Sequence, residues 1–188
     1  INGPIWALIA LDSHNYGIPA GTASNPTTRD KLVTAILDAQ LPDGGWAYSG
    51  TEADSDMTGM ALQALAPYQK SNAGANAAIE RGLEYLRTGL NAEYAYTSPS
   101  TGAQVLLALA ALKLDVNKAG FGNEYRNLVS TLYEMILENS KVSFDALQVY
   151  QAFEAYRRYI DREASYWDLT GVALRKQPAT TEDTQEPT

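Results

Sequence analysis

The sequence contains no cysteine and a single histidine. Without thiols the chain forms no disulfide, and it offers no thiolate for nucleophilic catalysis. A zinc site built from Asp, Cys and His is excluded for the same reason. The one histidine, His14, falls in a stretch with Gly17 and Pro19 and is expected to be a loop residue, because metal sites need several donors. We expect no metal and no cofactor.

Basic residues and long apolar runs are also scarce. Lys and Arg number 14 against 22 Asp and Glu, which gives a net charge of −8. This balance argues against a nucleic-acid surface and against docking on anionic lipid, since both need clustered cations. The longest purely apolar run, residues 105–112, is well short of the ~20 residues that a membrane-spanning helix needs. We therefore expect no nucleic-acid partner and no membrane span.

The chain is long enough for one domain with a sizeable core, with 188 residues of which 45% are hydrophobic. Residues 1–175 are expected to form that domain. Residues 176–188 are rich in Thr, Glu, Gln and Pro and carry no large apolar side chain, which predicts a linker or tail. The chain starts without an initiator Met and shows no signal peptide. We interpret it as a piece of a longer protein that can carry neighbouring domains.

Helices with one polar face alternate with helices that are apolar almost all round. Amphipathic stripes of helical period mark residues 27–38, 76–88 and 124–138. Apolar runs mark residues 5–11, 58–65 and 101–112. The first of these should be buried on all sides. A wetter helix at residues 143–159 is expected to be terminal, and this alternation predicts an all-α fold.

The alternation contains an internal repeat. The pattern Gln-Val-x-x-Ala at Gln104 recurs at Gln148, and aromatic residues follow the first two amphipathic helices at Trp46 and Tyr96. A period of about 50 residues is typical of stacked helical hairpins, which share a core that no single hairpin could bury. The segment 166–170, Tyr-Trp-Asp-Leu-Thr, is expected to pack back over this core.

One stretch carries a basic residue, an aliphatic residue, Gln and Gly-x-Trp at fixed spacings, namely Lys31, Ile36, Gln40, Gly44 and Trp46. These positions resemble the recurring motif of the prenyltransferase and squalene-oxidase repeat family, although Ala35 replaces the aromatic residue of that motif. A second, partial copy keeps Arg81, Gly82, Tyr85 and Leu86, and has Tyr94 and Tyr96 in place of Gly and Trp.

The resemblance implies an α/α toroid, in which an inner ring of helices is surrounded by an outer ring. The apolar helices would be inner and the amphipathic helices outer. The chain holds too few helices to close such a ring, so the resemblance implies a partial ring, the C-terminal part of a longer toroid. The Tyr-Trp-Asp-Leu-Thr segment and the polar tail are most similar to the bacterial surface-protein branch, which implies a secreted or cell-surface location.

Two carboxylates are candidates for acid catalysis. Class II terpene cyclases of this family protonate an alkene with the middle carboxyl of an Asp-x-Asp-Asp motif, and the resemblance maps its first two positions onto Asp54 and Asp56. Met57 stands in place of the third carboxylate, which removes part of the tuning that neighbouring charges provide. The alternative is that both carboxylates cap a helix, and we favour capping.

A ligand site is the other hypothesis. The starts of the inner helices and the loops before them would gather aromatic and polar residues at one end of the ring, a usual lining for a pocket. These are Trp46, Tyr48, Tyr94, Tyr96, Thr101 and Asp145. Alternatively, the resemblance implies that Trp46 wedges between neighbouring hairpins and that Gln40 holds the start of the next helix. The acidic loop 43–56 shows no ordered spacing of Ca²⁺ ligands.

The preferred hypothesis is a non-catalytic domain of a secreted or cell-surface bacterial protein that binds a small molecule or a surface partner. The first alternative is a terpenoid-cyclase-like enzyme with Asp56 as proton donor. The second is a corrinoid-binding domain, because the resemblance extends to cobalamin carriers.

Overall fold

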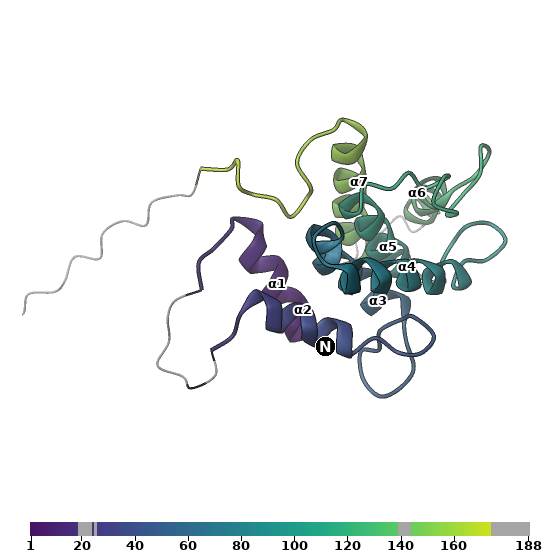
Figure 1. Ribbon diagram of the computed structural model, residues 1–188. Helices are drawn as coiled ribbons and strands as arrows, with labels where there is room; N and C mark the ends of the chain where they lie inside the picture. The colour runs from purple at the N-terminus through teal and green to yellow at the C-terminus, as the bar shows by residue number, and fades with distance from the viewer. Residues whose placement is uncertain (19–23, 25, 139–143, 174–188) are drawn as a thin grey trace, which may run out of the picture.

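The computed structural model describes residues 1–18, 24, 26–138 and 144–173. Within them the chain forms helices and two isolated bridges but no β-strand, so the all-α prediction is confirmed. The helices, labelled in Figure 1, are α1 Asn2–Ser13, α2 Arg29–Asp38, α3 Ser55–Leu65, η1 Ala66–Tyr68, α4 Ala73–Thr88, α5 Pro99–Ala111, α6 Leu128–Glu138 and α7 Phe144–Ile160. The predicted tail, residues 176–188, lies outside the described residues.

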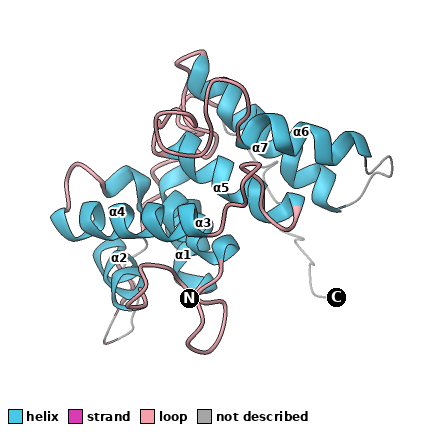
Figure 2. Cartoon of the chain, turned by 90° about the vertical axis from the view of Figure 1, so that its right-hand side faces the viewer, coloured by secondary structure: helices cyan, strands magenta, loops and turns pink. Residues whose placement is uncertain are grey.

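The helices form two layers. We call α1, α3, α5 and α7 the central row, because each contacts the next. The other three pack on this row: α2 on α1, α4 on α3, and α6 on α5 and α7. Figure 2 shows α2 and α4 at one side of the molecule and α6 and α7 at the other. None of the helices in the described residues has the length and apolarity needed to cross a membrane.

Burial explains which helices take the central positions. All residues of α5 from Gly102 to Ala110 are buried, as expected of a helix that is apolar on every side. In α4, by contrast, Ile79 and Leu86 are buried while Glu80 and Glu84 are exposed. The most apolar helices, α3 and α5, therefore take the middle of the row, and the amphipathic α4 packs on α3.

Trp46 is the wedge between the first two hairpins. Its side chain is fully buried, and its indole N–H donates to the Ile36 carbonyl at 2.7 Å. Gly82 makes room for it, since a Cβ there would lie 3.0 Å from the indole ring. Gln40 donates from Nε2 to the carbonyl of Ala78 in α4 at 2.9 Å. The interpretation of Trp46 as a wedge is confirmed. Gln40 does not hold the start of the next helix, α3, because its carboxamide bonds to the sixth residue of α4.

Two expectations about single helices are wrong. The helix predicted from residue 124 begins at Leu128, because the Asn127 carboxamide accepts from the backbone N–H groups of Val129 and Ser130 at 3.0 and 3.1 Å and fixes the first turn there. The first helix is not buried on all sides, since Trp6 is 36% exposed. It is an end member of the central row, with α3 as its neighbour on one side.

Candidate functional site

Asp54 is used as a helix cap. Its Oδ1 accepts from the backbone N–H of Met57 at 2.7 Å, and its Oδ2 accepts from that of Tyr48 at 3.0 Å. The extended backbone of Asp54 and its place directly before α3 are those of an N-cap residue. Capping by Asp54 is therefore confirmed.

Asp56 lies in the first turn of α3 and faces the start of α5. Its Oδ2 accepts a hydrogen bond from the Thr101 hydroxyl at 3.1 Å. Partial burial raises the pKa of the Asp56 carboxyl; the Thr101 bond opposes this rise and the charge of Asp54 adds to it. The folded protein therefore favours the protonated form of the Asp56 carboxyl more than water does.

A second hydrogen bond joins the starts of the next two helices of the row, α5 and α7. The Ser100 hydroxyl donates to Asp145 at the start of α7. Asp56, Thr101 and Asp145 therefore mark one end of α3, α5 and α7, which agrees with the prediction that the starts of the apolar helices lie together. Each is half-buried and already hydrogen-bonded.

The predicted aromatic residues do not gather around a pocket at this end. Trp46 and Tyr96 are 0% and 5% exposed, and both lie in the core because they join neighbouring hairpins. Tyr94 is half-buried, and its carbonyl accepts from the Thr131 hydroxyl at 3.1 Å. Tyr48 is 69% exposed on the loop before α3. The prediction that these four line one site is wrong for Trp46 and Tyr96, because the core buries them. Neither Tyr48 nor Tyr94 lines either of the two cavities described below.

The opposite end of the central row holds a cavity of about 540 Å³. It opens where α1, α3 and α5 end, and the segment after α7 covers it. We call residues 165–172 the strap. The lining residues are Ile9, Asp12, Ser13, Gln63, Ala64, Ala66, Pro67, Gln69, Lys70, Ala111, Leu112, Lys113, Ser165, Trp167, Asp168 and Thr170. Sequence reasoning placed part of the strap over the core, which is confirmed, but it did not locate the cavity.

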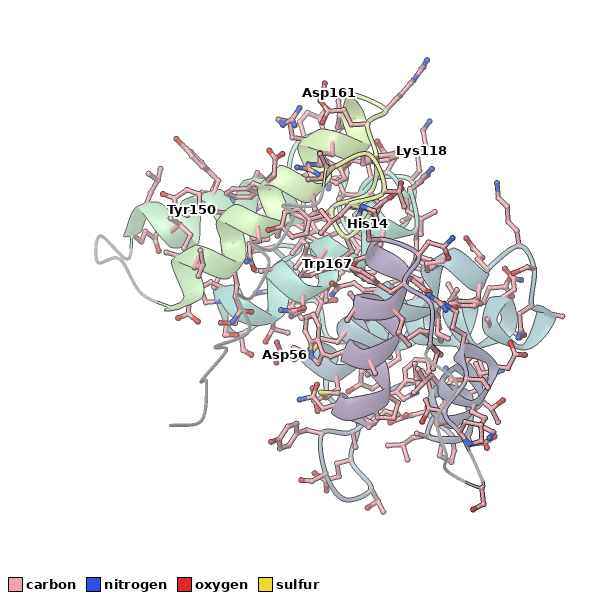
Figure 3. All side chains as sticks on the ribbon, turned by 90° about the vertical axis from the view of Figure 1, so that its left-hand side faces the viewer. His14, Asp56, Lys118, Tyr150, Asp161 and Trp167 are labelled. Carbon is pink, nitrogen blue, oxygen red and sulfur yellow. The ribbon has the colours of Figure 1, made fainter. Side chains whose placement is uncertain are left out.

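The strap joins the last helix of the row to the first. The Leu169 backbone N–H donates to the Ser13 carbonyl at 2.6 Å, and the His14 ring Nε2 lies 3.1 Å from the Val172 carbonyl oxygen. Figure 3 shows Trp167 near the end of α1 that carries His14, with Asp56 toward the other end of that helix. In Figure 1 the yellow-green chain after α7 runs back toward α1.

Trp167 is the central contact of the strap. Its indole packs edge-on against Trp6, with ring centroids 5.6 Å apart, and against Tyr166 at 4.9 Å. The Arg158 guanidinium lies 5.6 Å from the Tyr166 ring centroid and holds that side of the strap to α7. The indole N–H of Trp167 donates to Gln63 Oε1 at 2.9 Å.

Gln63 belongs to a chain of carboxamides that crosses the central row. Gln63 Nε2 donates to Gln104 Oε1 at 3.0 Å, and Gln104 Nε2 donates to Gln148 Oε1 at 3.0 Å. Gln63 and Gln104 are only 3% and 6% exposed. The sequence carried a signal for part of this chain, because Gln104 is the one strongly polar residue in the apolar run of α5, and its pattern recurs at Gln148.

The two carboxylates at the cavity already have hydrogen-bond partners. Asp12 pairs with Arg29 Nε at 2.6 Å and accepts from the Tyr68 hydroxyl at 2.8 Å. Asp168 accepts from the backbone N–H and the hydroxyl of Thr170, and these bonds lower the pKa of the Asp168 carboxyl. In the described part of the chain, no group of three or more His, Asp and Glu side chains is placed to hold a metal ion.

A second cavity, of about 560 Å³, lies between α6, α7 and the loop that precedes α6. Its lining includes Val129, Tyr133, Phe153 and Tyr156. Neither this cavity nor the one under the strap is lined by Asp54 or Asp56. The two carboxylates highlighted by the sequence are therefore separate from both cavities.

Comparison of the chain with protein-family models, with curated proteins and with solved structures gives no match, so its function is argued from the geometry above.

Proposed function

We propose that this domain binds a ligand without transforming it, and that the ligand occupies the cavity under the strap. The observation that carries this proposal is the cavity itself. Its volume of about 540 Å³ lies within the roughly 300–1,000 Å³ usual for small-molecule sites. An apolar floor from three helix ends and a few convergent polar groups, among them Gln63, are the features such sites share.

We further infer that the central row and its outer helices are an arc of an α/α toroid. Three features support this: each helix of the row packs on the next, amphipathic helices cover one side, and hydrogen bonds between the helix starts recur at Asp56–Thr101 and Ser100–Asp145. We propose a secreted or cell-surface location, supported by the resemblance stated above. Protease accessibility on intact cells of the source organism tests that location.

The binding proposal is tested by filling the cavity. Ala111 is half-buried and lines the cavity, whereas Ala77 is exposed on α4 and lies away from it. Ligand-observed NMR with a mixture of small aromatic and polar compounds should identify binders of the wild-type domain. Ala111→Phe should abolish their binding, and Ala77→Phe should leave it unchanged. Binding that survives Ala111→Phe would place the site elsewhere, and a screen without binders would count against the proposal.

A second candidate function rests on Asp56, because its raised pKa is the property that a proton donor needs. Incubation with squalene or geranylgeranyl diphosphate tests it. A cyclic product that is lost in Asp56→Asn would establish catalysis. Cobalamin tests the corrinoid alternative, since a bound corrinoid elutes with the protein as a coloured complex. We do not expect the cyclic product, because Asp56 lines neither cavity.

A further inference from the structure

The carboxamide of Gln63 has a fixed orientation. Its Nε2 faces three acceptors, which are Gln104 Oε1 at 3.0 Å and the carbonyl oxygens of Gln104 and Gly59 at 3.3 Å. A flipped amide would set its oxygen against three other oxygens and lose all of these bonds. Gln63 Oε1 therefore points toward the strap as a buried acceptor, and the Trp167 indole N–H satisfies it.

The surroundings of this acceptor also favour donors. The cavity lies at the C-terminal ends of α1, α3 and α5, and the aligned peptide dipoles give this end of a helix a partial negative charge. The lining carries two carboxylates, Asp12 and Asp168, and two lysines, Lys70 and Lys113, so its side-chain charges balance. Asp12 is already paired with Arg29, and the other three residues are exposed. A group that donates a hydrogen bond is favoured beside Gln63, and one that only accepts leaves Oε1 without a partner.

We propose that the Trp167 ring fills a slot beside Gln63 that selects planar aromatic molecules with a ring N–H. A free ligand of this class competes with the Trp167 ring for that slot. The inference rests on the proposed function and names the ligand class of the same cavity. The indole of Trp167 supplies the required chemistry: a flat apolar ring, edge contacts to Trp6 and Tyr166, and one N–H aimed at Gln63.

The strap is built so that this exchange is feasible. It has no helical structure, and three contacts other than Trp167 hold it: Leu169 to Ser13, Val172 to His14, and Tyr166 to Arg158. A ligand that replaces the Trp167 ring exchanges one hydrogen bond for an equivalent one. Because the tethered indole acts at an effective concentration on the order of millimolar, free ligands should bind weakly to the wild-type protein and more tightly once the Trp167 ring is removed.

The test is chemical rescue of Trp167→Ala. This variant should melt at a lower temperature than the wild type, because it loses the ring contacts and leaves Gln63 Oε1 unpaired. Indole should raise its melting temperature in a saturable manner, since a ligand bound only by the folded state stabilises it. The matched probe 1-methylindole has a similar shape without the N–H, and it should bind about tenfold more weakly. Wild-type protein should respond little to either probe.

Gln63→Met in the Trp167→Ala background provides the control, because it removes the acceptor and should make the two probes equivalent. The indole ¹⁵N–H signal of buried Trp46 reports whether each variant retains its core. Equal affinity of the two probes for Trp167→Ala would overturn the N–H requirement and leave binding in the cavity intact. If Trp167→Ala folds and indole does not stabilise it, the proposal that the Trp167 ring fills a ligand slot is wrong.

If Trp167→Ala does not fold, the wild-type protein provides the test. Indole at high concentration must then shift the ¹⁵N–H signal of Trp167 and not that of Trp46, and the opposite result would refute the proposal.

Discussion

Tyr94 occupies the position that Gly44 holds one hairpin earlier, and both have a left-handed backbone, with φ of 57° and 90°. The turns around them match: the Gly44 N–H donates to the Leu41 carbonyl at 2.9 Å, and the Tyr94 N–H donates to the Asn91 carbonyl at 3.1 Å. A side chain in this conformation costs about 1–2 kcal/mol. The second hairpin therefore repeats the shape of the turn although it lacks the glycine.

Replacement of Gly44 by alanine should be strongly destabilising. The new Cβ would lie 2.6 Å from the Arg81 carbonyl oxygen of α4, in addition to the cost of the positive φ. We expect a loss of more than about 2 kcal/mol in urea unfolding. Gly50 is the matched control, because its φ is 75° and nothing lies within 4 Å of a Cβ there. Gly50→Ala should lose about 1 kcal/mol, and equal losses would show that the approach to Arg81 is unimportant.

Substitutions that remove the buried hydrogen bonds of Trp46 and Tyr96 should lower the free energy of unfolding by different amounts. Tyr96 donates to the Leu86 carbonyl at 2.6 Å, so Tyr96→Phe keeps the ring and should lose about 1 kcal/mol. Trp46→Phe removes the bond to Ile36 and also leaves a cavity against Gly82, so we expect about 2–4 kcal/mol. Urea midpoints of both variants test this order. A smaller loss for Trp46→Phe would contradict the wedge role.

Neutralising Asp54, directly before α3, and Asp56, within α3, should change the stability of the fold in opposite directions. Asp54→Ala removes the cap on Met57 N and should lower the free energy of unfolding by about 1 kcal/mol. Burial raises the pKa of Asp56 in the folded state, so its ionisation opposes folding once the pH exceeds the usual value of 3.8. Asp56→Asn, which can still accept from Thr101, should therefore raise the melting temperature at pH 7.

The pH dependence provides the check on Asp56. Below about pH 3.8 the carboxyl is protonated in both the folded and the unfolded state, so the difference between wild type and Asp56→Asn should vanish there. The stability difference between the two proteins should grow as the pH rises from there to the folded-state pKa of Asp56, and it should stay constant above that pKa. Calorimetric melting curves at several pH values measure this. A wild type more stable than Asp56→Asn at pH 7 would mean that the carboxylate, not the acid, is favoured by the fold.

Substitution of the middle glutamine of the carboxamide chain should lower the free energy of unfolding more than substitution of an end glutamine. Gln104 is buried and uses both ends of its amide, so Gln104→Leu leaves Gln148 Oε1 without a donor and Gln63 Nε2 without one acceptor. We expect a loss of about 2 kcal/mol. Gln148 is half-buried at the end of the chain, and Gln148→Leu should lose less than about 1 kcal/mol. Equal losses in urea unfolding would indicate that the chain does not act as a connected unit.

Periodic features were predictable from the sequence, and contacts without a period were not. The apolar run of α5 and the spacing of Trp46 and Tyr96 follow from helix geometry and from the repeat, so both the helices and the wedge were foreseen. The start of α6 depends on the side chain of Asn127, a local contact that hydrophobic spacing does not encode. The bond between Trp167 and Gln63 joins residues 104 positions apart and belongs to no repeat.

The predicted aromatic lining was wrong at Trp46 and Tyr96 for a related physical reason. Aromatic residues near the helix starts are typical of a pocket lining, but in Trp46 and Tyr96 the same residue type fills the space between hairpins. The cavity under the strap forms where three helices end, and its floor consists of ordinary alanine, leucine and isoleucine side chains. Such residues carry no signal of function until a distant segment covers them.

The contact between His14 and Val172 spans 158 positions of the chain, so the strap closes a very long loop. Such a closure is slow, and it becomes favourable only after the helices between its ends have stacked. We expect the strap to dock after the rate-limiting step of folding. Stopped-flow measurements should then show that Trp167→Ala unfolds faster than the wild type and folds at nearly the same rate. A slowed folding rate would instead place the docking of the strap in the folding nucleus.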